Sequence, residues 1–170
     1  MTLGCPDRTL RRAFFCTGFS TGFPNVTRLT LSFVGRYYVE PGVPLLDMIS
    51  LFPALQELYI STFGGIVSDP SPQAVPPPGL RRLELAGDAF GLILKWMMLL
   101  MTNLSPPTLE SLTMDLTLLL YRNMDWAALD TALQRFPRLQ NVLVKCGRHH
   151  GQRLYEALPL LATSGMLSIK

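Results

Sequence analysis

The stretch "PPPGLRRLELAG", Pro76–Gly87, places three prolines and a glycine in front of a short alternation of apolar and polar residues. Within it, Leu80, Leu83 and Leu85 follow the spacing L-x-x-L-x-L. Proline cannot continue a helix, and it biases the residue before it toward extended backbone. Alternating apolar residues share one face of a strand. The stretch therefore predicts a strand that begins directly after a proline-rich turn.

The same pattern occurs five times along the chain, as "VTRLTL", "LQELYI", "LRRLEL", "LESLTM" and "LQNVLV". The copies begin at Val26, Leu55, Leu80, Leu109 and Leu139, so successive copies are 29, 25, 29 and 30 residues apart. A proline stands shortly before each copy, in "GFPN", "LFPA", "PPPG", "SPPT" and "RFPR". A repeat of this length indicates units of one strand and its connection, stacked on one another.

Two further segments extend the series. "GMLSIK" at residues 165–170 carries Leu167 and Ile169, and we interpret it as a sixth strand. "TLRRAFFC", Thr9–Cys16, is the candidate for a degraded earlier copy. We therefore treat residues 1–21 as an N-terminal segment and residues 22–170 as the repeat domain.

Segments with helical spacing lie between the strands. In Met124–Phe136 the apolar residues recur on one face, with Asp125 expected as the N-cap or in the first turn. Gly165 is placed to end the helix predicted over 150–165. Ala89–Leu104 is shorter than the roughly 20 residues of a membrane span and contains Lys95, so we expect a buried helix and no membrane partner. A further helix is predicted over Val43–Phe52.

Strands joined by helical crossovers of this length favour parallel neighbours. The sequence thus predicts an α/β solenoid with the strands in chain order in one curved parallel sheet, and with the helices on one side. Ten strand residues should be nearly fully buried: Leu29, Leu31, Leu58, Ile60, Leu83, Leu85, Leu112, Met114, Val142 and Val144.

The residues between the buried ones point to the other face, so their alignment predicts three rows across the sheet. The first row is Arg28, Glu57, Arg82, Ser111 and Asn141; the second is Thr30, Tyr59, Glu84, Thr113 and Leu143; the third is Ser32, Ser61, Ala86, Asp115 and Lys145. Arg28, Glu57 and Arg82 alternate in charge and could pair laterally. This face is either a solvated surface or a protein-binding surface. The candidate binding residues are Arg28, Glu57, Tyr59, Arg82, Glu84 and Leu143, because tyrosine and arginine dominate binding hot spots.

Composition narrows the function classes. The chain has 170 residues, 48% hydrophobic and 16% charged, with a net charge of +3 that is too small and scattered to favour nucleic acid. Its three cysteines are odd in number and widely spaced, and the N-terminus has no apolar segment of signal-peptide length. These features favour a reducing, cytoplasmic or nuclear location.

No catalytic or cofactor motif is found in the sequence. His149 and His150 are adjacent and lie close to Cys146, but no second pair of ligands stands at zinc-site spacing and no acid lies nearby to orient a catalytic histidine. Phosphate-binding and dinucleotide-binding loops are not found either. We therefore expect a non-catalytic protein that needs no metal or cofactor.

The order of these motifs resembles the leucine-rich-repeat-like region of fungal F-box proteins. The resemblance rests on "FPNVTRLTLS", "FPALQELYIS", "PPGLRRLELAG", and the ending "DWAALDTALQRFPRLQNVLVKC" with "LPLLATSGMLSIK". It implies a repeat domain that captures the substrate of a ubiquitin ligase, while an F-box binds a Skp-type adaptor. We find no F-box here, so binding of that adaptor is expected only if one lies upstream. The alternative is a structural interaction domain unrelated to ubiquitin.

The repeats depart from the standard leucine-rich repeat, in which an asparagine closes each copy. The equivalent positions hold Val34, Phe63, Asp88, Thr117 and Gly147. The sequence therefore predicts an irregular solenoid.

Overall fold

A computed structural model describes residues 2–4, 23–34, 49, 51–63, 77–87, 108–115, 125–147 and 150–170. Its strands are β1 (Thr2–Gly4), β2 (Arg28–Val34), β3 (Glu57–Phe63), β4 (Arg82–Gly87), β5 (Ser111–Asp115), β6 (Asn141–Lys145) and β7 (Leu167–Ile169). Its named helices are α4 (Trp126–Leu133), α5 (Gly151–Ala157) and α6 (Pro159–Thr163).

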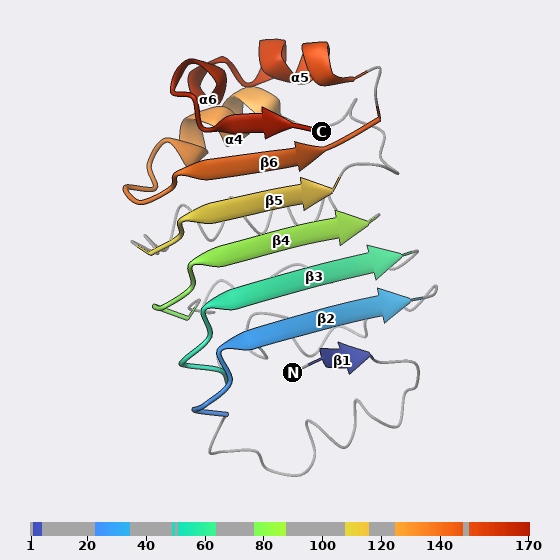
Figure 1. The fold of residues 1–170 in the computed structure, drawn as a ribbon, viewed down its shortest axis with the longest axis vertical. Helices are drawn as coiled ribbons and strands as arrows, with labels where there is room; N and C mark the ends of the chain where they lie inside the picture. The colour runs from blue at the N-terminus through green and yellow to red at the C-terminus, as the bar shows by residue number, and fades with distance from the viewer. Residues whose placement is uncertain are drawn as a thin grey trace.

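The strands form one seven-stranded sheet in the order β1-β2-β3-β4-β5-β6-β7, and every neighbouring pair is parallel (Figure 1). The predicted parallel arrangement in chain order is confirmed. Each copy of the repeat supplies one strand, and the predicted sixth strand is β7. The strand beside β2 comes from Thr2–Gly4, with Leu3 opposite Leu31. The predicted degraded copy at Thr9–Cys16 lies outside the described residues.

The prolines before the strands sit in tight turns. The N–H groups of Val26, Leu55, Leu80 and Leu139 each donate to the carbonyl three residues earlier, at 3.1–3.3 Å. In all four turns a proline occupies the second position, where its fixed φ suits a β-turn. This explains why a proline precedes each of these strands: its fixed φ favours the turn that leads the chain into the sheet.

A second backbone feature recurs one residue later and sets the register. The carbonyl of Thr27 accepts from Gln56 N and Glu57 N at 2.8 and 3.0 Å. The carbonyls of Gln56, Arg81 and Glu110 each accept from the equivalent pair of N–H groups on the next strand, at 2.8–3.3 Å. Because the same bonds join each neighbouring pair from β2 to β6, equivalent residues of successive copies lie side by side.

The core lies on one face of the sheet. All ten predicted strand residues are at most 4% exposed, which confirms the predicted inward positions. Leu129 and Leu133 of α4, Leu154 of α5 and Leu161 of α6 join the same cluster, so these helices pack on that face. Figure 1 shows α4 behind the strands.

The helices differ from prediction at their ends. Of the two positions predicted for Asp125, it takes the N-cap of α4, its carboxylate accepting from Ala128 N at 3.0 Å, but the helix ends at Leu133 and Phe136 opens the following turn. The helix predicted over 150–165 is wrong as a single element. It is divided at Leu158 into α5 and α6, because Pro159 disfavours helical backbone in the residue before it. Gly165 follows α6 with a φ of 73°, as expected of a helix-ending glycine.

The helix predicted over Val43–Phe52 can be compared with the structure only at its end. Ile49 is helical, whereas Phe52 begins a turn rather than ending a helix. Residues 43–48 and 50, like all of Ala89–Leu104, lie outside the described residues. Within the part of the chain that is described, no helix has the length and apolar character needed to cross a membrane.

Candidate binding face

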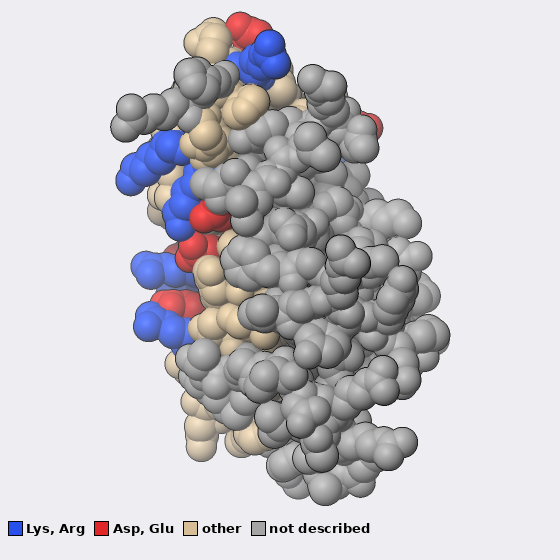
Figure 2. Space-filling model, turned by 90° about the vertical axis from the view of Figure 1, so that its right-hand side faces the viewer, with Lys and Arg blue, Asp and Glu red and all other residues tan. Residues whose placement is uncertain are grey.

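The face of the sheet opposite the core, here called the outer face, carries the three predicted rows. Strand pairing aligns Arg28, Glu57, Arg82, Ser111 and Asn141 as row one. The same pairing aligns the second and third rows as the repeat predicts. Figure 2 shows lysine, arginine and acidic side chains alternating along this side of the molecule. The spacing of the repeat alone therefore placed side chains from five strands correctly beside one another.

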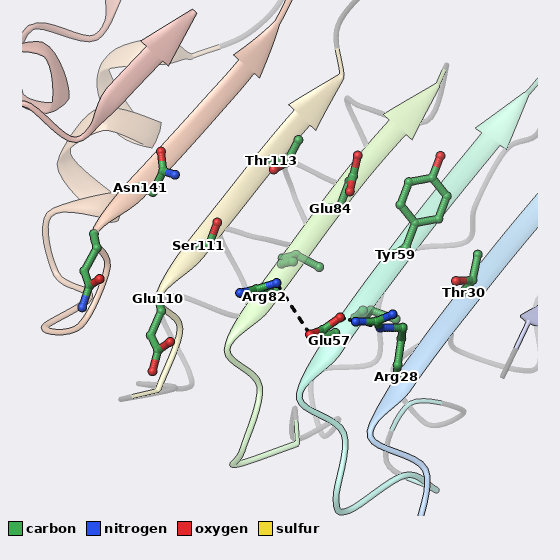
Figure 3. A pocket seen from close by; sticks show the side chains of 13 residues that line it. Arg28, Thr30, Glu57, Tyr59, Arg82, Glu84, Glu110, Ser111, Thr113 and Asn141 are labelled. Atoms are coloured by element: carbon green, nitrogen blue, oxygen red, sulfur yellow. Dashed lines mark hydrogen bonds and ion pairs between the residues drawn. The ribbon is translucent and has the colours of Figure 1, made fainter.

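Three charged side chains of row one form a lateral ladder. Glu57 accepts a hydrogen bond from Arg28 Nε at 2.5 Å, and its other oxygen lies 3.7 Å from Arg82 Nη1 (Figure 3). The hydrogen bond from Arg28 holds the pKa of the Glu57 carboxyl below its ordinary value, and it raises the pKa of Arg28. The predicted lateral pairing is present, with two arginines sharing one carboxylate.

A longer ion pair crosses the face and was not predicted. Lys145 Nζ on β6 donates to Glu84 Oε1 on β4 at 2.8 Å, so this pair passes over the intervening strand β5. The hydrogen bond to Glu84 raises the pKa of Lys145, and the charge of Asp115 adds to this. The rows compare adjacent strands at equal register, whereas lysine is long enough to reach the second strand and the neighbouring row.

A depression of about 670 Å³ lies on the outer face over rows one and two. Five of the six candidate binding residues line it: Arg28, Glu57, Tyr59, Arg82 and Glu84. They come from three strands and are seen together in Figure 3. Leu143, the sixth, is half-buried in row two on β6 and is not among the lining residues.

The depression is also lined by residues that were not among the predicted binding residues. Besides the core residues Leu58 and Leu83, they are mainly short polar side chains of rows one and two, with two residues that precede strands: Thr30, Ser111, Thr113, Asn141, Glu110 and Gln140. Four of these were already placed in the predicted rows. Their small size makes them weak hot-spot candidates on residue type alone, so only their position in the sheet distinguishes them.

Row three is less accessible than its predicted outward orientation implied. Ser61 is 4% exposed and Ala86 is 6% exposed, although both point to the outer face. Ser61 Oγ donates to Ser32 Oγ at 3.1 Å. Row three is therefore closed to a partner at β3 and β4, whereas Lys145 at its β6 end has a side chain that is 39% exposed.

The histidine and cysteine cluster forms no site that the described residues can define. Cys146 is half-buried after β6, His150 is the N-cap residue before α5, and His149 lies outside the described residues. Among the residues with described positions, no group of three or more His, Cys, Asp or Glu side chains could hold a metal ion.

Asp130, a buried acid, has a structural partner. Its carboxylate accepts from Leu160 N and Leu161 N at 2.8 and 3.0 Å, at the start of α6. It therefore joins α4 to α6 inside the molecule, away from the outer face.

Comparisons with models of known families, with curated proteins and with solved structures returned no match.

Proposed function

We propose that this chain is an irregular leucine-rich-repeat-like solenoid that binds another protein through the outer face of its sheet. Its role is the substrate-recognition part of an F-box-type ubiquitin ligase adaptor in the cytoplasm or nucleus. It acts by binding, without catalysis or a cofactor. The ubiquitin connection rests on the sequence resemblance.

The observation that supports protein binding is the composition of the depression. It joins an aromatic side chain, Tyr59, to arginines and short polar groups from neighbouring strands. Tyrosine and arginine are enriched in binding hot spots, and a rigid sheet holds them with little loss of entropy on binding. The Glu84–Lys145 and Arg28–Glu57 pairs restrain the long side chains before a partner arrives.

The experiment is a comparison of partners captured by the wild-type chain and two charge-reversed variants. Arg82→Glu changes the depression, whereas Arg153→Glu makes the same change on an exposed residue of α5. Partners that bind the outer face should be lost with Arg82→Glu and retained with Arg153→Glu. Identical partner sets for the three proteins would reject the outer face as the binding site.

The role in ubiquitin ligation is tested on the partners identified in this way. Deleting the protein in its own cells should lengthen their lifetimes, and restoring it with Arg82→Glu should not shorten them again. Partners whose lifetimes do not respond would indicate the structural interaction domain instead. The isolated chain should not bind a Skp-type adaptor, since no F-box is found in it; direct binding would identify a docking segment within these residues.

A further inference from the structure

Charge is unevenly distributed over the depression. Glu84 is paired with Lys145 at 2.8 Å, and Glu110 lies 3.9 Å from Arg81, so each of these acids has a cation on this chain. In row one, by contrast, Arg28 and Arg82 share the single carboxylate of Glu57. Row one therefore carries one positive charge in excess.

That excess charge lies at Arg82. Arg28 holds Glu57 at 2.5 Å, whereas the Arg82–Glu57 separation of 3.7 Å exceeds a hydrogen-bond distance. The Arg82 side chain is 69% exposed. A guanidinium presents five N–H donors in a planar fork that matches a carboxylate, so Arg82 has the geometry and the access to receive one.

The strand beside Arg82 adds neutral donors. Ser111 of β5 is the register partner of Arg82, and Asn141 of β6 is the register partner of Ser111 (Figure 3). Both line the depression with Thr113, the next outward residue of β5. Serine and threonine are shorter than the arginine and glutamate on β4, and over β5 they line the depression with hydroxyl groups, here called the hydroxyl floor.

On the side toward row three, the Glu84–Lys145 ion pair bounds the hydroxyl floor. Since it joins β4 to β6, it crosses β5 between Thr113 and Asp115. The positive charge of Lys145 also interacts with Asp115, and it offsets the repulsion that this carboxylate would exert on an anion over β5.

We propose that the partner places an aspartate or glutamate side chain against Arg82, over the hydroxyl floor of Ser111 and Thr113. This inference rests on the proposed function and names the chemistry of its occupant: a segment of a protein with an acidic anchor. A single carboxylate matches the single excess charge of row one. A phosphate dianion would bring a second negative charge close to Glu57 and Glu84.

The test is selection from a random peptide display library on the immobilised wild-type chain. Enriched peptides should carry Asp or Glu at one fixed position, and changing that acid to its amide should weaken binding about thirtyfold, as expected for a hot spot. Added salt should weaken the binding of the acidic peptide more than the binding of its amide form. Selection on Arg82→Glu should favour Lys or Arg at that position.

A matched pair of variants tests the position of the site. Ser111→Asp puts a carboxylate into the floor beside Arg82 and should abolish binding of the acidic peptide. Thr30→Asp makes a similar change on β2, two strands from Arg82 and in the same depression, and should have little effect. Both variants should first be shown to fold by their thermal unfolding curves.

The outcomes separate this inference from the proposed function. Enriched peptides without a common acid, equal effects of Ser111→Asp and Thr30→Asp, or no enrichment at all would each overturn the acidic anchor. Protein binding by the outer face would still be decided by the partner comparison of Arg82→Glu with Arg153→Glu, which assumes nothing about the partner's charge.

Discussion

At the scale of single residues, the two faces of the sheet should respond very differently to truncation. Leu83 of β4 is 4% exposed within the core, whereas Leu143 of β6 is half-buried on the outer face. Leu83→Ala should lower the free energy of unfolding by about 2–5 kcal/mol, because a packed sheet cannot close around the cavity. Leu143→Ala is the control and should cost much less. Denaturant unfolding measures both, and a loss below about 1 kcal/mol for Leu83→Ala would contradict its core position.

Glu57 should contribute to the loss of stability at acidic pH. Its pKa in the folded chain is lowered from the ordinary 4.5 by the hydrogen bond from Arg28. The ionised form therefore stabilises the fold above pH 4.5, and this contribution is lost as pH falls through the lowered pKa. Glu57→Gln should remove that part of the acid destabilisation and lower the melting temperature at neutral pH by only about 2–4 °C, because exposed ion pairs contribute little. Thermal melts from about pH 3 to pH 7, on the order of half a pH unit apart, test it; parallel acid limbs for wild type and Glu57→Gln would contradict the assignment.

At the scale of elements, Asp130 should couple α6 to α4. Removing its carboxylate leaves the N–H groups of Leu160 and Leu161 without their acceptor at the start of α6. Asp130→Ala should cost about 1–3 kcal/mol and increase hydrogen exchange in α6. Asp125→Ala, which removes the exposed cap of α4, is the comparison and should cost about 0.5–2 kcal/mol without affecting α6. Unchanged exchange in α6 after Asp130→Ala would show that the carboxylate does not hold it.

The strands that follow the repeat could be predicted from the sequence, whereas β1 and the link between α4 and α6 could not. The proline turns and the leucine spacing fix where β2 to β6 begin and which residues are buried, because both signals are local. β1 was missed because Thr2–Gly4 is three residues long and offers only Leu3 as an apolar signal. The α5–α6 division could have been predicted, since Pro159 is visible in the sequence, but Asp130 gives no local sign of the helix that it caps.

The contacts of the outer face could likewise be predicted only where they follow the strand register. The register that buries Leu58 and Leu83 also places Glu57 beside Arg82, so the ladder follows from the core pattern. The Glu84–Lys145 pair joins residues 61 positions apart, and it depends on side-chain length and on the strand between them. The spacing of the repeat predicts neither the reach of a side chain nor what lies across the intervening strand.

At the scale of the whole molecule, the sheet should unfold from its ends if the chain is a solenoid. Each strand pairs only with its neighbours in sequence, from β1 to β7. Stability in such arrays is a sum of unit and nearest-neighbour terms, so damage at one end should spread only to adjacent units. Leu167→Ala, in β7 at the C-terminal edge, should increase hydrogen exchange in β6 and β7 while β2 and β3 keep their protection.

The matched variant for this prediction is Leu31→Ala in β2, toward the other edge of the sheet. It should reverse the pattern, exposing β2 and β3 while β6 and β7 keep their protection, because the two ends share no strand pairing. Native-state hydrogen exchange resolved by peptide distinguishes the two responses. If either variant lowered protection equally across all strands, the sheet would be one cooperative unit, and the solenoid description of this chain would be wrong.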